Sequence, residues 1–312
     1  MAGKRFLFVS GDIGGAKSQV PVAKLLKSLR HEIAIGADGA GKGIDVWMQE
    51  KFDFRVINDI DEFHIEDLIA WSDLIFVSTC ASATRLVEEV AKKCFGQDVP
   101  VVMGADGFFN HGFKKWQAVN ANYWFAITKG HAQAIRALRP NLPPECIIVV
   151  GQPAFDSAMD LISRKEEIRL NRRNQLGIGA EKAALWWPTG MGELIEEDIE
   201  MVKAAIEQLS KMNTIFMMNG CHPKLENVRK GYIADIISRI SDCCRDHGVK
   251  FINTQSMKIP LEELGLASDV ILSITCTEDV KITLMGGPPV VHLLGPTTRE
   301  WMENELLLNP PY

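Results

Sequence analysis

The chain has 312 residues, about twice the usual length of a domain, so we expect two domains or one large α/β domain. Hydrophobic residues make up 46% of it, charged residues 24% and aromatic residues 8%, which excludes disordered, collagen-like and coiled-coil proteins. The net charge of −6 comes without a dense stripe of basic residues, so we expect no nucleic acid partner.

The first half of the chain alternates expected strands with expected helices. Residues 4–10 form an apolar run typical of a buried strand, and residues 11–19 form a glycine-rich loop before a helix at residues 20–29. Further strands are expected at residues 31–36, 55–58, 73–78, 100–104, 123–128 and 146–150, and further helices at residues 44–51, 61–71, 82–93 and 131–138. Strands separated by helices at this spacing predict right-handed βαβ crossovers and a parallel sheet.

The second half repeats this rhythm after a charged, helix-prone stretch, residues 156–180, which we interpret as a linker. Strands are expected at residues 183–187, 214–219, 250–253, 269–273 and 289–293, and helices at residues 195–211, 231–247, 261–266 and 277–285. The sequence therefore predicts an α/β protein with two Rossmann-like parallel-sheet domains, residues 1–155 and 181–312, facing each other across a cleft.

Ligands of open α/β sheets bind beyond the carboxyl ends of the strands, and the segment Gly11-Asp12-Ile13-Gly14-Gly15 lies at the first of these ends. Its glycines let the backbone approach a phosphate or a sugar closely, but they are equally typical of a tight turn between strand and helix. The segment lacks the Gly-x-Gly-x-x-Gly pattern and the Gly-Lys-Ser/Thr ending, which disfavours an NAD-linked oxidoreductase and a P-loop.

Several short segments, in the right order, carry a resemblance to a known family. Gly151-Gln152-Pro153-Ala154-Phe155-Asp156 resembles the Gly-Asn/His-Pro-x-x-Asp segment that closes the first domain of UDP-N-acetylglucosamine 2-epimerases, lipid-A-disaccharide synthases and related GT-B enzymes. Gly14-Gly15 before Pro21-Val22-Ala23, His222-Pro223, and Ala267–Ser273 with Thr275–Val291 look like the other conserved parts of that superfamily. The resemblance implies a GT-B-like fold, an acceptor in the first domain and a nucleotide-sugar donor in the second.

A nucleoside diphosphate needs N–H donors or positive charge, which a helix N-terminus and a histidine supply. We expect this donor site at His222, Thr275, Cys276, Thr277, Glu278 and Lys281, with Gly14, Gly15 and Gly190 in loops that contact substrate. The alternative is that Thr277 and Glu278 only cap the helix and that Lys281 points to solvent.

Two departures from the family pattern bear on the donor. Thr275-Cys276-Thr277 replaces the usual Ser-Gly, and Lys281 replaces the glutamate that binds ribose, so the donor is unusual or not used. Pro188–Glu193 replaces the His-Arg-x-Glu-Asn segment of epimerases, which weakens an epimerase function.

A base that deprotonates a sugar hydroxyl must be a carboxylate or an imidazole in a partly desolvated site. The candidates are Asp106, Asp12 and His111, of which Asp106 and His111 lie in a glycine-rich, aromatic loop after the strand at residues 100–104. A surface turn in which Asp106 bonds its own backbone is the alternative. The histidine that inverting relatives carry after Gly14-Gly15 is absent, since Ala16 and Lys17 stand there.

These observations predict a GT-B-like glycosyltransferase that moves a sugar from a nucleotide-sugar to an acceptor hydroxyl of a small molecule or glycan. The alternatives are a UDP-sugar 2-epimerase, a CDP-glycerol-type phosphotransferase and a nucleotide-sugar binding protein without catalysis. We expect no cofactor and no metal, because the seven cysteines and seven histidines lack metal-ligand spacing. Without an apolar run of ~18 residues or a signal-like segment, we expect a cytoplasmic protein with no transmembrane segment, and a homodimer stays open.

Overall fold

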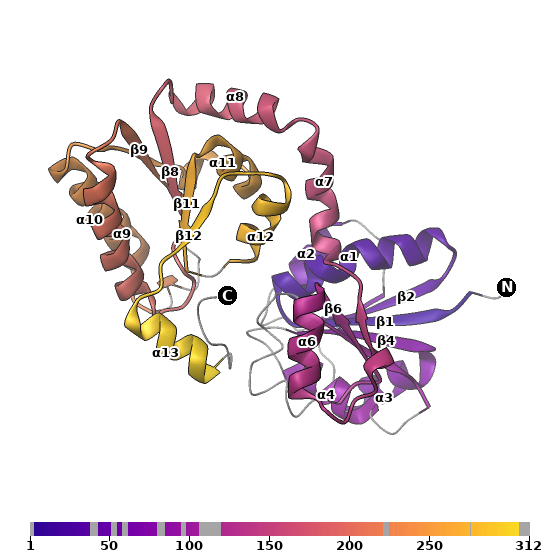
Figure 1. Ribbon diagram of the computed structural model, residues 1–312. Helices are drawn as coiled ribbons and strands as arrows, with labels where there is room; N and C mark the ends of the chain where they lie inside the picture. Colours follow the sequence, from indigo (N-terminus) through magenta and orange to yellow (C-terminus); the bar gives the residue numbers. More distant parts are fainter. Residues whose placement is uncertain are drawn as a thin grey trace. The chain divides into compact units, whose positions relative to one another are not determined.

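The structure of the protein is a computed structural model. It describes residues 3–37, 43–50, 55–57, 62–79, 85–94, 98–105, 120–220, 225–226, 228–274 and 276–305. The chain divides into two compact units, residues 1–156 together with the residues from 303 onward, and residues 157–302 (Figure 1). No helix in the described part of the chain is both long and apolar enough to cross a membrane.

The first unit is built on a seven-stranded, wholly parallel sheet in the order β3-β2-β1-β4-β5-β6-β7. The strands are β1 (Arg5–Ser10), β2 (Glu32–Ala37), β3 (Arg55–Ile57), β4 (Leu74–Ser78), β5 (Val101–Gly104), β6 (Tyr123–Ala126) and β7 (Ile147–Val149). The helices are α1 (Ile13–Ser28), α2 (Gly43–Gln49), α3 (Glu62–Trp71), α4 (Arg85–Cys94) and α6 (Lys129–Leu138), with 3-10 turns η3 (Pro144–Cys146) and η4 (Pro153–Phe155).

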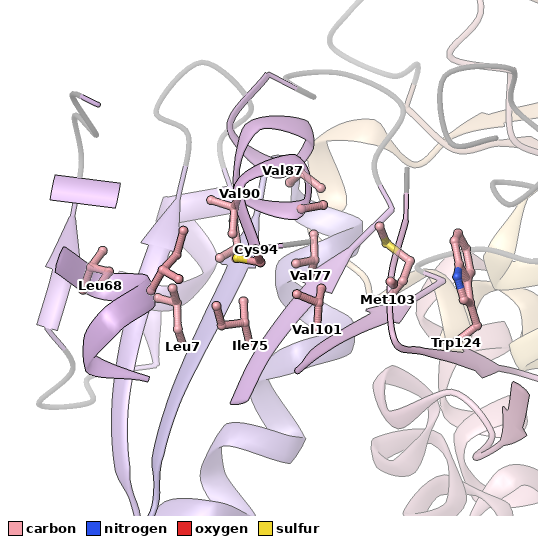
Figure 2. Packing of buried hydrophobic residues seen from close by; sticks show 14 of the residues in the cluster. Leu7, Leu68, Ile75, Val77, Val87, Val90, Cys94, Val101, Met103 and Trp124 are labelled. Carbon is pink, nitrogen blue, oxygen red and sulfur yellow. The ribbon is translucent and has the colours of Figure 1, made fainter. Parts of the chain in front are cut away.

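Alternation along the strands places a hydrophobic layer on each face of this sheet. Leu7 and Ile75 pack under α3 and α4, where Figure 2 shows them beside Val90 and Cys94. Phe8, the neighbour of Leu7 in β1, points to the other face and packs with residues of α1 and α2. Because both faces are covered near β1, its residues Leu7, Phe8 and Val9 are all buried and apolar, as the sequence predicts for a buried strand.

The second unit carries a five-stranded parallel sheet in the order β10-β9-β8-β11-β12. Its strands are β8 (Lys182–Trp186), β9 (Thr214–Met218), β10 (Lys250–Asn253), β11 (Val270–Ser273) and β12 (Val290–His292). Its helices are α7 (Asp156–Ile162), α8 (Lys165–Leu176), α9 (Ile195–Leu209), α10 (Tyr232–Asp246), α11 (Leu261–Ala267), α12 (Thr277–Leu284) and α13 (Pro296–Glu305), with a 3-10 turn η6 (Gln255–Met257). Buried residues of α9 and α10 pack on one face of the sheet, and those of α11 and α12 pack on the other.

The prediction of two parallel-sheet α/β units is confirmed, but one helix begins earlier than predicted. The first helix starts at Ile13, where the sequence analysis places a loop up to Gln19. The reason is the N-cap: the Asp12 side chain accepts a hydrogen bond from Gly15 N (3.0 Å), so the helix starts directly after β1. Gly14 and Gly15 are therefore helical residues, and the prediction that they form a loop is wrong.

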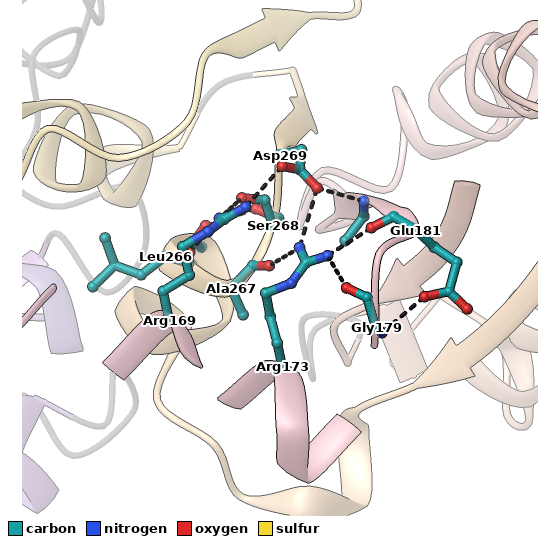
Figure 3. A network of polar contacts seen from close by, with 10 residues as sticks. Arg169, Arg173, Gly179, Glu181, Leu266, Ala267, Ser268 and Asp269 are labelled. Carbon is teal, nitrogen blue, oxygen red and sulfur yellow. Dashed lines mark hydrogen bonds and ion pairs between the residues drawn. The ribbon is translucent and has the colours of Figure 1, made fainter. Parts of the chain in front are cut away.

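The charged stretch interpreted as a linker contains α7 and α8, and α8 is fixed to the second unit by its arginines (Figure 3). Arg169 donates to the Leu266 carbonyl (2.8 Å) and to Asp269 Oδ1 (2.7 Å). Arg173 donates to the Ala267 carbonyl and to Asp269 Oδ2, each at 3.1 Å. These guanidinium groups satisfy carbonyls at the carboxyl end of α11, where positive charge is favourable.

Candidate functional site

Each sheet has one point where the strand order reverses, between β1 and β4 in the first unit and between β8 and β11 in the second. The loops after the two strands at such a point run to opposite faces of the sheet and leave room for a ligand at the carboxyl edge. Each unit therefore has one candidate edge.

At the first edge, Gly15 makes a close contact between α1 and β4. A Cβ placed on Gly15 would lie 2.2 Å from Ser78 Oγ and 3.2 Å from Ser78 Cβ. This glycine thus lets α1 pack onto the end of β4, which is a different role from the predicted approach to a substrate. Gly14 is exposed at the same turn, and Asp12 is half-buried as the N-cap.

Gln19 lies one turn further along α1 and bridges the two strands at the reversal point. Its Nε2 donates to the Val9 carbonyl of β1 (3.0 Å) and to the Phe76 carbonyl of β4 (3.3 Å). Gln19 is not among the predicted site residues, although a glutamine on a largely apolar helix face is a signal that it has buried partners.

The Gly-Gln-Pro segment after β7 approaches the same edge. Gly151 has φ +82°, a conformation that favours glycine, and it lets the chain turn sharply after β7. Gln152 caps the turn η4 and donates from Nε2 to the Ala105 carbonyl (3.3 Å), directly after β5. Asp156, the last residue of the segment that resembles the family, is the first residue of α7. The two loop candidates for the base, Asp106 and His111, lie outside the described residues.

At the second edge, the reversal point between β8 and β11 is bridged by Trp187 and Asp279. Trp187 Nε1 donates to Asp279 Oδ1 (3.0 Å), and Cys276 N donates to Asp279 Oδ2 (3.1 Å). Burial raises the pKa of Asp279 to about 6, although hydrogen bonds from Ser273 and Trp187 and the charge of His292 oppose this. The cap of α12 is thus the pair Cys276 and Asp279, and not the pair Thr277 and Glu278 that the alternative interpretation of the sequence makes the cap.

Cys276–Asp279 has the spacing of a capping box, and this is the sequence signal that was missed. Burial raises the pKa of the Cys276 thiol to about 12, so this residue is a neutral capping group and no thiolate. Trp186 and Trp187 are both buried.

A second buried carboxyl group, Asp198 of α9, holds the loop after β8. Trp186 Nε1 donates to its Oδ1 (3.1 Å), and Thr189 N donates to its Oδ2 (2.9 Å). Burial raises the pKa of Asp198 to about 7, against the lowering effect of these two hydrogen bonds. Gly190, predicted to contact substrate, follows directly and is half-buried.

The sequence allows Lys281 either to bind a phosphate or to point to solvent, and the structure places it in a third environment. Its side chain is 8% exposed, its Nζ forms an ion pair with Glu262 of α11, and Glu278 Oε2 lies 3.7 Å from it. It therefore does not point to solvent, and its charge is already balanced by two carboxylates.

The remaining predicted donor residues are outside what the structure describes. His222 and Thr275 belong to segments without described placement, and for Thr277 only the helical backbone is described. Within the described residues, no group of three His, Cys, Asp or Glu side chains could hold a metal ion. A cavity of about 270 Å³ lies at the amino edge of the second sheet, lined by Arg169, Ser268 and Asp269 among others, and thus at the opposite edge from the candidate site.

Comparisons with known proteins identify the fold. No family model and no curated protein sequence matches the chain. Among solved structures, the UDP-GlcNAc 2-epimerase of Neisseria meningitidis bound to UDP-GlcNAc is 19% identical, with a TM-score of 0.65 over 95% of this chain and 84% of that one. HepE of Anabaena, in complex with UDP and glucose, is 15% identical, with a TM-score of 0.60 over 93% and 80%.

The wall teichoic acid polymerase TagF is 13% identical, with a TM-score of 0.53 over 92% of this chain and 69% of that one. At these identities the matches show the fold alone. The predicted GT-B-like fold, shared with glycosyltransferases and UDP-GlcNAc 2-epimerases, is confirmed.

Proposed function

We propose that the chain binds a nucleotide-sugar at the carboxyl edge of its second sheet and transfers the sugar to an acceptor hydroxyl. The observation that supports this most is the likeness, over more than nine tenths of the chain, to structures that hold UDP with glucose or UDP-GlcNAc. The reversal point between β8 and β11 supplies the matching place, because α12 starts there and its N-terminus favours a diphosphate.

In this reaction the acceptor oxygen forms a bond to the anomeric carbon while the bond from that carbon to the diphosphate breaks. The nucleoside diphosphate leaves, stabilised in our proposal by backbone N–H groups at the start of α12 and by His222 and Thr275. The acceptor proton passes to a base. Asp106 and His111 are better candidates than Asp12, because the Asp12 carboxylate is already engaged as the cap of α1.

The buried Asp279 fits this proposal. A carboxylate near a diphosphate is unfavourable, but the Asp279 oxygens accept hydrogen bonds from Trp187 and Cys276, and its pKa is raised to about 6. Both oxygens of this carboxyl group are therefore bonded to donors within the protein. Asp279 acts as a positioning group for the loop after β11, not as a base.

An epimerase is the second candidate, because the Neisseria epimerase gives a TM-score of 0.65 against 0.60 for HepE. The two reactions differ in what they need. A transferase releases nucleoside diphosphate only when an acceptor is present, whereas an epimerase changes the stereochemistry of the sugar without any acceptor.

The test is thermal unfolding of the full chain with UDP-, GDP-, CDP- and TDP-sugars, followed by measurement of nucleoside diphosphate release. One nucleotide is expected to raise the melting temperature, and His222→Ala is expected to remove this shift. His247→Ala, on an exposed residue at the end of α10, is the matched control. The absence of a shift with all four nucleotides would contradict the proposal, and a shift without release under any acceptor would indicate a binding protein.

A further inference from the structure

His292 is the last residue of β12 and lies at the carboxyl edge of the second sheet. It pairs with Ser273, the last residue of β11, so the two side chains leave the sheet on the same face. Val290, two residues earlier in β12, packs on the face covered by α11 and α12, whereas Leu293 packs on the opposite face. The imidazole of His292 therefore lies on the α12 side of the sheet, at the edge where α12 begins.

A backbone carbonyl holds the imidazole ring. Nδ1 of His292 lies 2.8 Å from the oxygen of Ile274, which directly follows β11. Because a carbonyl oxygen only accepts, Nδ1 carries the proton, and this contact fixes both the tautomer and the orientation of the ring. The side chain is exposed, and Nε2 has no hydrogen bond or ion pair with any residue that the structure describes. Nε2 is thus an oriented, accessible nitrogen that donates once the ring is protonated.

The ring also interacts electrostatically with the first turn of α12. Asp279 is 3% exposed, and the positive charge of His292 is one of the causes that oppose the rise of its pKa on burial. The Asp279 oxygens accept hydrogen bonds from Trp187 and Cys276 and form no ion pair with the ring. The carboxyl group therefore acts on the imidazole through its charge and leaves Nε2 accessible.

A diphosphate at the start of α12 calls for a positively charged donor, because charge-assisted hydrogen bonds to phosphate are the strong ones. Lys281 of the same helix is already engaged with Glu262 and Glu278. His292 is exposed and makes no such ion pair within the described part of the chain. Its ring is also oriented in advance, so little freedom is lost when it binds a ligand.

We propose that His292 binds a diphosphate group, with Nε2 of the protonated ring donating to a phosphate oxygen. The inference rests on the proposed function, in which this group is the diphosphate of the nucleotide-sugar, and it adds a contact from β12 to those expected from α12. The contact is made to the phosphates alone. A nucleoside without phosphates should therefore not depend on His292.

The experiment follows the ring of His292 in ¹H–¹³C spectra of the full chain, where its signal is assigned by its loss in His292→Gln. Inorganic pyrophosphate, UDP, GDP, CDP and TDP are titrated separately. Pyrophosphate and at least one nucleotide are expected to shift the signal. His247, exposed at the end of α10 and thus at the amino edge of the sheet, is the control in the same spectra, and its signal should not move.

His292→Gln keeps an amide that can donate to the Ile274 carbonyl but carries no charge. It should bind the diphosphate about tenfold more weakly or worse, and it should bind the corresponding nucleoside as the natural chain does. His247→Gln should match the natural chain with both ligands. Thermal unfolding of each variant without ligand checks that it is folded.

The outcomes separate this inference from the proposed function. A nucleotide that raises the melting temperature but leaves the His292 signal in place, or binds His292→Gln equally well, would overturn the inference and leave the proposed function standing. A His292-dependent response to pyrophosphate without any response to the nucleotides would support the contact and contradict the nucleotide-sugar donor. Equal shifts of His292 and His247, or no shift with any of these ligands, would also overturn the inference.

Discussion

The contact between Gly15 and Ser78 gives the sharpest stability prediction. In Gly15→Ala, the new methyl carbon would meet Ser78 Oγ at 2.2 Å and Ser78 Cβ at 3.2 Å, so the Ser78 hydroxyl must rotate away and α1 must move slightly from β4. Overpacking of this kind costs about 1–3 kcal/mol, and the higher helix propensity of alanine returns at most about 1 kcal/mol. We expect the free energy of unfolding to fall by about 1–2 kcal/mol.

The assay is a double-mutant cycle by urea unfolding with Gly15→Ala, Ser78→Ala and the double variant. Ser78→Ala removes the oxygen at 2.2 Å, so Gly15→Ala should become neutral or stabilising in that background, with a coupling of about 1–2 kcal/mol. If Gly15→Ala is neutral in the natural chain, or equally damaging in both backgrounds, the glycine is not there for helix packing. A loss of ligand binding at unchanged stability would instead restore the substrate-contact hypothesis for Gly15.

Three further predictions concern the second unit. Asp198 holds a proton up to about pH 7 in the folded state, whereas in the unfolded chain it releases the proton near pH 3.8. The free energy of unfolding should therefore fall as the pH rises between these two values. Asp198→Asn should reduce the difference between urea unfolding at ~pH 5 and at ~pH 8. Burial alone would raise the pKa of Asp269, but Ala183 N–H and the two guanidinium groups hold it below 3.8, so its contribution is present above that pH and lost in acid. Asp269→Asn should cost about 3 kcal/mol at neutral pH by thermal unfolding, whereas Glu167→Gln, on an exposed ion pair, should change stability by less than about 0.5 kcal/mol. Gly177 has φ +63° at the end of α8. Gly177→Ala should therefore lower the free energy of unfolding, measured with urea, by about 1 kcal/mol, and Gly177→Asn should lower it by less. Equal effects of the two substitutions would contradict the backbone argument.

The sequence was sufficient for the sheets because their strands are short apolar runs between helical segments. Leu7 and Phe8 illustrate this, since neighbouring residues are buried on opposite faces and the run cannot be mistaken for a half-exposed strand. The start of α1 was missed because Gly14 and Gly15 suggest a loop when read alone. What decides the start is the Asp12 cap together with the close fit of Gly15 against Ser78, and the second depends on a residue more than sixty positions away.

In the candidate site, too, some features could be predicted from the sequence and others depend on residues far apart in the chain. The carboxyl edges could be located from topology alone, but Lys281 could not be placed, because its partner Glu262 comes from α11 and lies 19 residues away. Asp279 was overlooked since Thr277 and Glu278 also satisfy the preferences of a helix start. The hydrogen bond from the buried Trp187 Nε1 selects Asp279, and not Glu278, as the capping carboxyl group.

The arginines of α8 have a practical consequence for dissecting the molecule. A fragment that starts at Glu181, where the predicted second domain begins, would separate Asp269 from both Arg169 and Arg173 and remove the guanidinium donors of the α11 carbonyls. A fragment that starts at Lys165 keeps all of these bonds. Anyone who expresses the second half by itself should therefore cut before α8, at the turn that follows α7.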